Sequence, residues 1–515
     1  MRLFTHAILL LSILLACNGK KKQIESVLAI ETGIIEGVFN EESGVYVFKG
    51  IPFAKAPVAS LRWRPPQSAE SWQDTLDAST FGPICMQRKP QPFSMWTSEF
   101  IAPAGNMSED CLNLNIWTKE GATDAKRPVL VFIHGGGFNS GSNSVPIYNG
   151  EKMAEKGVVF VTINYRVGIF GFMAHPELSE ESPRNASGNY GLLDQIAALQ
   201  WVQRNIAKFG GDPANVTIAG QSAGSYSVNY LVASPLGKGL FHRAAAESGA
   251  ALLPSNRLTG NTLKAAEERG TELSADISKL RELSADSLLA FQQQFGPIVD
   301  GHFLPRPVHI IFAEGNQNDV PVLTGWNADE GNFMGPVQDA ADFRQSMKDR
   351  YEEYSGEVLE LFPATNDSVA RESQLDLVSL LTFGLQSWKW MQMQNKTGET
   401  AVYIYHFTRD LPYTDEQQDY GAFHTGEIMY AYNTLHKSGR PWQKTDHELA
   451  EKMSSYWVNF ARDGDPNGEG LPQWPATGVK EYPTMFLGDS VGSGSIPGKE
   501  RLQLLDKIYS ERLGD

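Results

Sequence analysis

The sequence predicts an α/β fold with helices on both faces of a mostly parallel central sheet. Apolar runs rich in β-branched residues alternate with helical patterns and with turns that contain Gly, Asn and Pro. The apolar runs are continuous, which is typical of strands buried on both faces. Although 515 residues would suffice for about two to four domains, no linker or repeat divides the body of the chain. We therefore expect one large domain with inserted, cap-like segments.

Five apolar runs are the strongest strand candidates. They are residues 128–133, 158–164, 216–219, 322–325 and 401–407. Residues 192–209 carry apolar side chains at helical spacing and end at a Gly-Gly pair, which is a helix stop signal. Residues 223–232 form a second helix candidate. Because ligand sites in such sheets lie where the parallel strands end, the residues after each strand are the first candidates for a functional site.

Composition favours a globular protein and excludes one class of partner. Hydrophobic residues make up 41 % of the chain and charged residues 20 %, which provides enough apolar material for a large core. The formal net charge is -16, so the protein repels phosphate backbones and anionic lipid headgroups. We expect no nucleic-acid partner, and membrane contact only through a lipid at the N-terminus.

The N-terminus has the pattern of a cleaved export signal. An apolar stretch over 7–16 follows Arg2 and ends at Cys17, before a polar run of lysines. A membrane-spanning helix needs about 20 apolar residues, so this stretch is too short for a permanent span. The sequence Leu14-Leu15-Ala16-Cys17 resembles a bacterial lipobox. We therefore predict three segments, which are a signal peptide over 1–16, a linker over 17–27 that starts at a lipid-modified Cys17, and a folded domain over 28–511.

These segments predict an exported protein that is anchored to a bacterial membrane and faces the periplasm or the cell surface. The alternative is an ordinary cleaved signal with an incidental cysteine, which would give a secreted or periplasmic protein without a lipid. No later segment approaches the length of a membrane span.

Cys85 and Cys111 are the other two cysteines of the chain. In an oxidising compartment they are expected to form a disulfide, which would stabilise the fold by about 3 kcal/mol by restricting the unfolded chain. Two buried free thiols are the alternative.

Ser222 is the candidate nucleophile. It stands at the centre of Gly220-Gln221-Ser222-Ala223-Gly224, which fits the G-x-S-x-G pattern between a strand candidate and a helix candidate. Small residues at both flanks permit a sharp turn that would expose the serine hydroxyl above the sheet. The alternative is a glycine-rich turn with an incidental serine.

A second glycine-rich loop, HGGGF at 134–138, directly follows the first strand candidate. Consecutive glycines let backbone N–H groups face a bound carbonyl oxygen without interference from a Cβ. We expect Gly136 and Gly137 to donate such hydrogen bonds together with Ala223, the residue after the nucleophile. His134 is expected to be a structural hydrogen-bonding residue. A merely flexible loop is the alternative.

The same chemistry requires a histidine base after the nucleophile in the chain. Seven histidines satisfy this order, namely His242, His302, His309, His406, His424, His436 and His447. His424 lies in a Gly-bounded loop beyond the strand candidate 401–407, whereas His406 lies inside that strand and is expected to be structural. We favour His424, but sequence spacing alone does not choose among the seven.

An acid is required as well, and it should lie between the nucleophile and the base. Glu330 follows the strand candidate 322–325 and is the preferred residue. Asp329 and Asp300 are the alternatives.

Many short motifs occur in the order found in a known family. They are GIPFA at 50–54, LRW at 61–63, EDCL at 109–112, HGGGF at 134–138, NYRVG at 164–168, GNYGLLDQ at 188–195, FGGDP at 209–213, GDPN at 464–467 and PQWP at 472–475. Together they cover most of the chain after the signal segment. On these motifs the chain resembles the type B carboxylesterase/cholinesterase family of the α/β-hydrolase fold.

The resemblance implies a serine hydrolase that cleaves carboxylic esters through an acyl-enzyme intermediate, with its catalytic domain over 28–511. It assigns the nucleophile to Ser222, the acid to Glu330 and the base to His424. It also assigns the oxyanion donors to Gly136, Gly137 and Ala223, and one family disulfide to Cys85 with Cys111. Activity should fall at low pH, where a histidine base becomes protonated.

Two positions depart from the family pattern. Gln221 precedes the nucleophile where the family usually has Glu, which removes a negative charge beside the active site. We therefore expect no preference for choline esters. Glu247-Ser248-Gly249 stands where the family often has Gln-Ser-Gly. Ser248 is expected to support the acid and base indirectly, and no role is predicted for Glu247.

The substrate is expected to be a small ester, and no metal or organic cofactor is implied, because no His, Cys and carboxylate cluster has ligand spacing. The main rival is a non-catalytic adhesion or binding protein on the same fold, which would have lost the nucleophile, the acid or the base. Amidase or lipase activity with the same residues is a further alternative. Trp96 and Phe333 are candidates for the wall of the acyl pocket. The natural ester and the oligomeric state are left open.

Overall fold

The computed structural model describes residues 23–253, 262–333, 337–414 and 418–513. The predicted signal peptide over 1–16 and the predicted lipid site Cys17 lie outside the described residues. No helix within the described part of the chain combines the length and the apolar character needed to cross a bilayer.

The described residues form one large sheet in the order β16-β15-β14-β13-β12-β11-β9-β10-β8-β4-β3. Its strands are β3 (Val38–Asn40), β4 (Val45–Pro52), β8 (Asn113–Lys119), β9 (Arg127–Ile133), β10 (Val159–Ile163), β11 (Gly211–Gln221), β12 (Arg243–Glu247), β13 (Val322–Asn327), β14 (Val402–Phe407), β15 (Pro483–Leu487) and β16 (Val491–Ser495). The strands from β15 to β10 run parallel, and antiparallel strands complete both edges. The predicted, mostly parallel sheet is confirmed.

Two small sheets lie beside the large one. One contains β1 (Val27–Ile30), β2 (Gly33–Glu36) and β5 (Leu76–Asp77), and the other contains β6 (Ile84–Cys85) and β7 (Met107–Ser108). Cys85 and Cys111 form a disulfide with an S–S distance of 2.13 Å, so the predicted pairing is confirmed.

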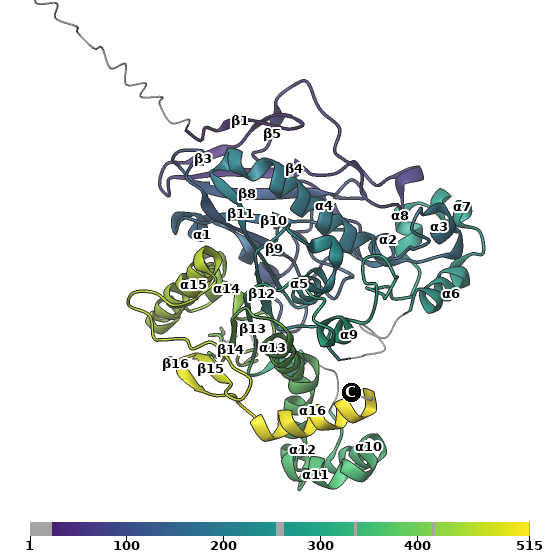
Figure 1. The fold of residues 1–515 in the computed structure, drawn as a ribbon, viewed down its shortest axis with the longest axis vertical. Helices are drawn as coiled ribbons and strands as arrows, with labels where there is room; N and C mark the ends of the chain where they lie inside the picture. Colours follow the sequence, from purple (N-terminus) through teal and green to yellow (C-terminus); the bar gives the residue numbers. More distant parts are fainter. Residues whose placement is uncertain (1–22, 254–261, 334–336, 415–417, 514–515) are drawn as a thin grey trace, which may run out of the picture.

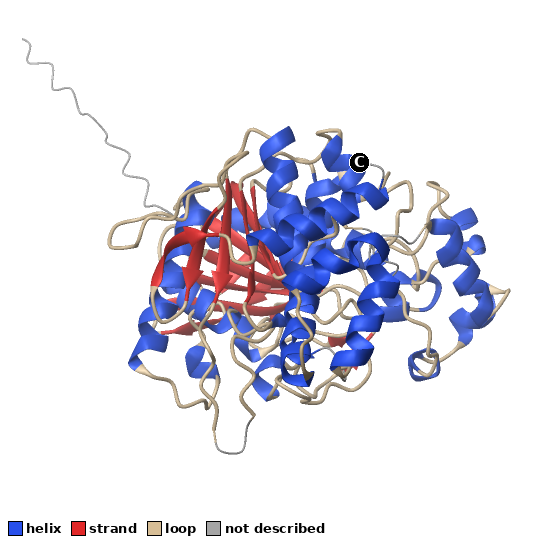
Figure 2. Cartoon of the chain, turned by 90° about the horizontal axis from the view of Figure 1, so that it is seen from below, coloured by secondary structure: helices blue, strands red, loops and turns tan. Residues whose placement is uncertain are grey.

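Helices flank the sheet on both sides (Figures 1 and 2). They are α1 (Glu151–Glu155), α2 (Gly168–Phe172), α3 (Pro176–Glu181), α4 (Tyr190–Asn205), α5 (Ala223–Ala233), α6 (Leu263–Leu273), α7 (Ile277–Glu282), α8 (Ala285–Leu289), α9 (Val308–Ala313), α10 (Ala340–Tyr351), α11 (Ser355–Leu361), α12 (Asp367–Ser379), α13 (Leu385–Thr397), α14 (Ile428–Ala431), α15 (Lys444–Asp463) and α16 (Lys499–Leu513).

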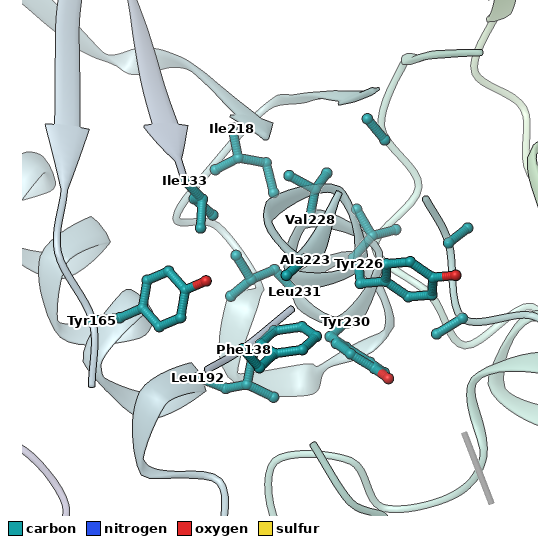
Figure 3. Packing of buried hydrophobic residues seen from close by; sticks show 14 of the residues in the cluster. Ile133, Phe138, Tyr165, Leu192, Ile218, Ala223, Tyr226, Val228, Tyr230 and Leu231 are labelled. Atoms are coloured by element: carbon teal, nitrogen blue, oxygen red, sulfur yellow. The ribbon is translucent and has the colours of Figure 1, made fainter. Parts of the chain in front are cut away.

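Side-chain alternation along β9 divides the core between the two faces of the sheet. Val129, Val131 and Ile133 belong to one cluster of buried apolar residues, which includes residues of α4 and α5. Leu130 and Phe132 belong to a second cluster, which includes residues of α15. Successive side chains of a strand point to opposite faces, so a continuous apolar run supplies both clusters. Figure 3 shows the first cluster packed around α5.

The predicted elements agree with the structure, and their bounds shift by a few residues. The helix predicted over 192–209 is α4 followed by a 3-10 turn over Ile206–Phe209, and Gly210 ends it with φ 78°. The strand predicted over 216–219 lies within the longer β11. β12 was not predicted, because its sequence RAAAE contains no β-branched or aromatic residue.

Candidate active site

Ser222 occupies the turn between β11 and α5 with a backbone φ of 56° and ψ of -122°. Positive φ is unfavourable for a residue with a Cβ and costs on the order of 1–3 kcal/mol. Backbone hydrogen bonds hold the turn, since the Ser222 N–H donates to the Glu247 carbonyl at 2.9 Å and the Tyr226 N–H donates to the Ser222 carbonyl at 2.9 Å. Ser222 is partly exposed between two buried neighbours. The turn therefore presents the serine at a surface.

The two flanking glycines are required by close backbone contacts. A Cβ on Gly224 would lie 2.0 Å from the Ile133 carbonyl oxygen, and a Cβ on Gly220 would lie 2.5 Å from the carbonyl of Gly224. Neither position has room for a side chain. The G-x-S-x-G spacing thus reflects how tightly α5 starts against the end of β9.

The HGGGF loop leaves the neighbouring strand β9 and lies beside Ser222. A Cβ on Gly135 would be 3.2 Å from the Cβ of Ser222. Gly136 and Gly137 have φ of 111° and 61°, which favours glycine. Neither residue's N–H donates to an acceptor within the described chain. Ala223 is the first residue of α5, where the helix itself provides no acceptor for the N–H.

His424 and Glu330 meet through a buried contact. The Nδ1 atom of His424 lies 2.5 Å from Oε2 of Glu330, and the two residues are 5 % and 0 % exposed. The other carboxylate oxygen, Oε1, accepts hydrogen bonds from the Ser248 hydroxyl at 2.5 Å and from the Asn327 N–H at 2.8 Å. With Nδ1–H donating to Glu330, the Nε2 atom of His424 is the acceptor of a neutral imidazole.

The two alternative acids, the alternative base His406 and the loop residue His134 have other partners or surroundings. Asp329 accepts the Ala422 N–H at 2.9 Å, and Asp300 accepts two backbone N–H groups of its own turn. His406 is buried in β14, and burial lowers its pKa to about 4. His134 stacks on Tyr165 with ring centroids 4.3 Å apart. Among the acids considered, only Glu330 bonds to His424.

Comparisons with known proteins agree with this geometry. The model of the carboxylesterase family matches residues 24–504. The fumonisin B1 esterase of Sphingopyxis macrogoltabida is 37 % identical over 497 residues, which cover 90 % of this chain and 86 % of the relative. The para-nitrobenzyl esterase of Bacillus subtilis is 33 % identical over 505 residues, which cover 93 % of this chain and 98 % of the relative. A solved structure of PNB esterase matches with a TM-score of 0.80 and 30 % identity, covering 93 % of this chain and 99 % of that chain.

The chain belongs to the carboxylesterase family. It is a carboxylic ester hydrolase with the α/β-hydrolase fold, as the sequence motifs imply.

In this carboxylesterase, Gln221 links the turn that holds Ser222 to His424. Its Nε2 atom lies 3.2 Å from Nε2 and 3.4 Å from Nδ1 of His424, so it lies over the ring and does not occupy the in-plane lone pair of Nε2. Its Oε1 accepts the Thr425 hydroxyl at 3.3 Å. The Thr425 oxygen in turn accepts the indole N–H of Trp96 at 3.2 Å. An indole can only donate, so the hydroxyl proton of Thr425 points to Oε1 and the amide N–H of Gln221 points to the imidazole. Thr425, which sequence reasoning missed, directly follows His424 in the chain.

Two further buried acids lie behind the site. Glu247 accepts hydrogen bonds from the indole of Trp457 at 2.5 Å and from the hydroxyl of Tyr432 at 3.2 Å. Burial, together with nearby Glu427, raises the pKa of Glu247 well above its ordinary value. Burial and the charge of Glu330 raise the pKa of Glu427 to about 7. Glu247, for which no role was predicted, therefore belongs to a buried hydrogen-bond network.

Ser222 and His424 line a cavity of about 1230 Å³. Its apolar wall contains Trp96, Leu253, Phe295, Leu381 and Phe383. Phe383 stacks on the His424 ring with centroids 4.6 Å apart. Trp96, predicted for the acyl pocket, lines the cavity, whereas the side chain of Phe333 lies outside the described part. Ser222 and His424 thus face a space large enough for an extended ester.

Replacing Gln221 with Glu tests the contact between the side chain of residue 221 and the imidazole of His424. The variant places a carboxylate where an amide N–H donor stood, and a nearby negative charge favours the protonated imidazole. We expect the acid limb of the kcat/KM–pH profile to move to higher pH by about one unit, measured with 4-nitrophenyl butyrate. The Gln221→Ala variant, which adds no charge, is the control. An unchanged acid limb in Gln221→Glu would contradict the assigned contact.

Proposed function

We propose that this carboxylesterase acts through an acyl-enzyme formed on Ser222, within a catalytic domain over 28–511. His424 takes the proton of the Ser222 hydroxyl through Nε2, and the serine oxygen forms a bond to the ester carbonyl carbon. Glu330 accepts the Nδ1–H of His424, so it orients the ring and stabilises the positive charge that the ring gains. The buried contact of 2.5 Å between His424 and Glu330 is the observation that carries this proposal.

The oxyanion is stabilised by three backbone N–H groups, those of Gly136, Gly137 and Ala223. As the tetrahedral intermediate collapses, the bond to the alcohol oxygen breaks and His424 returns its proton to that oxygen. Water then attacks the acyl-enzyme with His424 again as the base, which releases the carboxylic acid and restores Ser222. Gln221 and Ser248 do not react in this scheme. They position His424 and Glu330.

An intact set of nucleophile, base and acid favours hydrolysis over a non-catalytic binding role on the same fold. The apolar side chains of the cavity wall, such as Leu381 and Phe383, suit the carbon chain of an ester. The relatives are also named as esterases.

The Ser222→Ala variant tests the nucleophile. We expect kcat/KM for 4-nitrophenyl acetate and butyrate to fall by about 10³-fold or more, because the hydroxyl that forms the acyl-enzyme is removed. The parent protein should release a burst of nitrophenol equal to the enzyme concentration if deacylation is slow. Ser490→Ala, at an exposed serine in the turn between β15 and β16, is the matched control. Equal rates for Ser222→Ala and the parent would remove the assignment.

We also propose that the mature protein begins at Cys17 and carries a lipid there, which anchors it to a bacterial membrane. The apolar stretch, its short length and the lipobox-like sequence support this proposal.

The Cys17→Ser variant tests the anchor. In a bacterial host, the parent should sediment with membranes, and its N-terminal peptide should carry the mass of a lipid. The variant should lose both properties, since the thiol that accepts the lipid is absent. A parent protein with an unmodified N-terminus in the soluble fraction would instead support an ordinary cleaved signal.

A further inference from the structure

The cavity that contains Ser222 has an unusual charge distribution. Its described lining includes four cationic residues, Arg88, Lys89, Arg269 and Arg350, and no Asp or Glu. The chain as a whole has 60 acidic and 44 basic residues. Acidic residues therefore outnumber basic residues in the protein but are missing from the described lining of this cavity.

The cations come from three separate parts of the fold. Arg88 and Lys89 lie between Cys85 and Trp96, in the segment that the disulfide closes. Arg269 lies on α6, and Arg350 lies in the last turn of α10. The four cationic residues therefore do not come from one stretch of the chain that is rich in Lys and Arg. The lining thus gathers positive charge from distant segments around one space.

None of the four cations forms an ion pair with a carboxylate of the described chain. Arg88 donates to the Gln292 amide oxygen at 3.1 Å, and Arg350 donates to the Tyr509 hydroxyl at 3.1 Å. Arg269 is half-buried, and its Nε has no hydrogen-bond partner. A buried guanidinium donor without an acceptor is unfavourable. The two terminal nitrogens of Arg269 also make no hydrogen bond within the described chain, so they can bind anionic oxygens of a ligand in the cavity that this residue lines.

Three arginines of the described chain, Arg62, Arg166 and Arg440, are less than 9 % exposed, and each of them is paired. Arg62 binds Glu109 with two hydrogen bonds, and Arg166 binds Asp194 in the same way. Arg440 contacts Glu99 at 3.3 Å. Arg269, which is half-buried, differs from these three because it has no carboxylate partner within the described chain, whereas Arg88 and Arg350 are exposed.

We propose that the substrate is an ester that also carries at least one ionised carboxylate, remote from the bond that is cleaved. The apolar wall near His424 takes the carbon chain, and the guanidinium group of Arg269 or that of Arg350, which lie on different helices, binds the carboxylate. Arginine suits this task because its planar donors match the two oxygens of a carboxylate. Arg88 and Lys89, both exposed, add positive potential that attracts an anionic substrate.

This inference rests on the proposed chemistry at Ser222, and it names the substrate class for that site. Matched pairs of esters test it. Each pair contains a 4-nitrophenyl monoester of a linear dicarboxylic acid and the neutral 4-nitrophenyl ester of the monocarboxylic acid of equal length. Chains of six, eight and ten carbons vary the distance between the two ends.

We expect at least one anionic ester to exceed its neutral partner in kcat/KM by about tenfold at low ionic strength. This advantage should shrink as salt is added, because salt screens the attraction. At least one of the variants Arg269→Gln and Arg350→Gln should lower kcat/KM for that anionic ester by about tenfold, mainly through KM. The neutral ester should keep its rate within twofold in both variants, which also shows that they are folded.

Arg306→Gln is the control. This arginine is exposed, pairs with Glu314 and lies outside the cavity lining, so its replacement should affect neither ester.

The proposal is overturned if no anionic ester is preferred over its neutral partner in the parent protein. It is equally overturned if the two cavity variants change both esters to the same extent. Failure of the proposed function looks different, because the neutral esters would then be hydrolysed equally well by the parent and by Ser222→Ala.

Discussion

The site depends on one buried contact, the hydrogen bond between His424 and Glu330. A carboxylate with no exposure to water is strongly unfavourable unless partners replace its hydration. Glu330 receives three donors, which are the imidazole, the Ser248 hydroxyl and the Asn327 N–H. These donors fix the carboxylate, and the carboxylate fixes the tautomer and orientation of the ring. The raised pKa values of Glu247 and Glu427 favour their neutral forms, so less negative charge is buried next to Glu330.

The parallel sheet brings these residues together although they are far apart in the chain. β11, β12 and β13 are neighbours, and each ends at a residue of the site. Ser222 follows β11, Ser248 follows β12, and Glu330 follows β13 after a short turn. Residues that leave adjacent parallel strands in the same direction meet at one edge. His424 arrives from the loop after β14, which is the next strand in the sheet.

The sequence allowed correct predictions where a short motif is required by contacts or burial of the same short segment. The glycines at 220 and 224 and the loop at 134–138 could be predicted, because tight backbone approaches exclude side chains there. Continuous apolar runs located β9, β10, β13 and β14 because these strands are buried on both faces. The base was different. Seven histidines fitted the required chain order, the Gly-bounded loop favoured His424, and the family resemblance then selected it.

The remaining features depend on contacts between distant residues. Glu247 accepts a hydrogen bond from Trp457, which lies 210 positions later in the chain. The sequence near Glu247 therefore does not reveal this contact. Gln221 was recognised as a departure from the family, but the direction of its amide depends on Trp96 and Thr425. The charge of the cavity wall likewise appears only when three separate segments converge.

The most direct test of the central claim is kcat of the Glu330→Gln variant on 4-nitrophenyl butyrate, measured alongside its thermal unfolding. The amide preserves the shape of the carboxylate but removes the charge that stabilises the imidazolium. We predict that kcat falls by roughly 10³- to 10⁴-fold while the unfolding transition stays cooperative. A folded variant with kcat within tenfold of the parent would contradict the account.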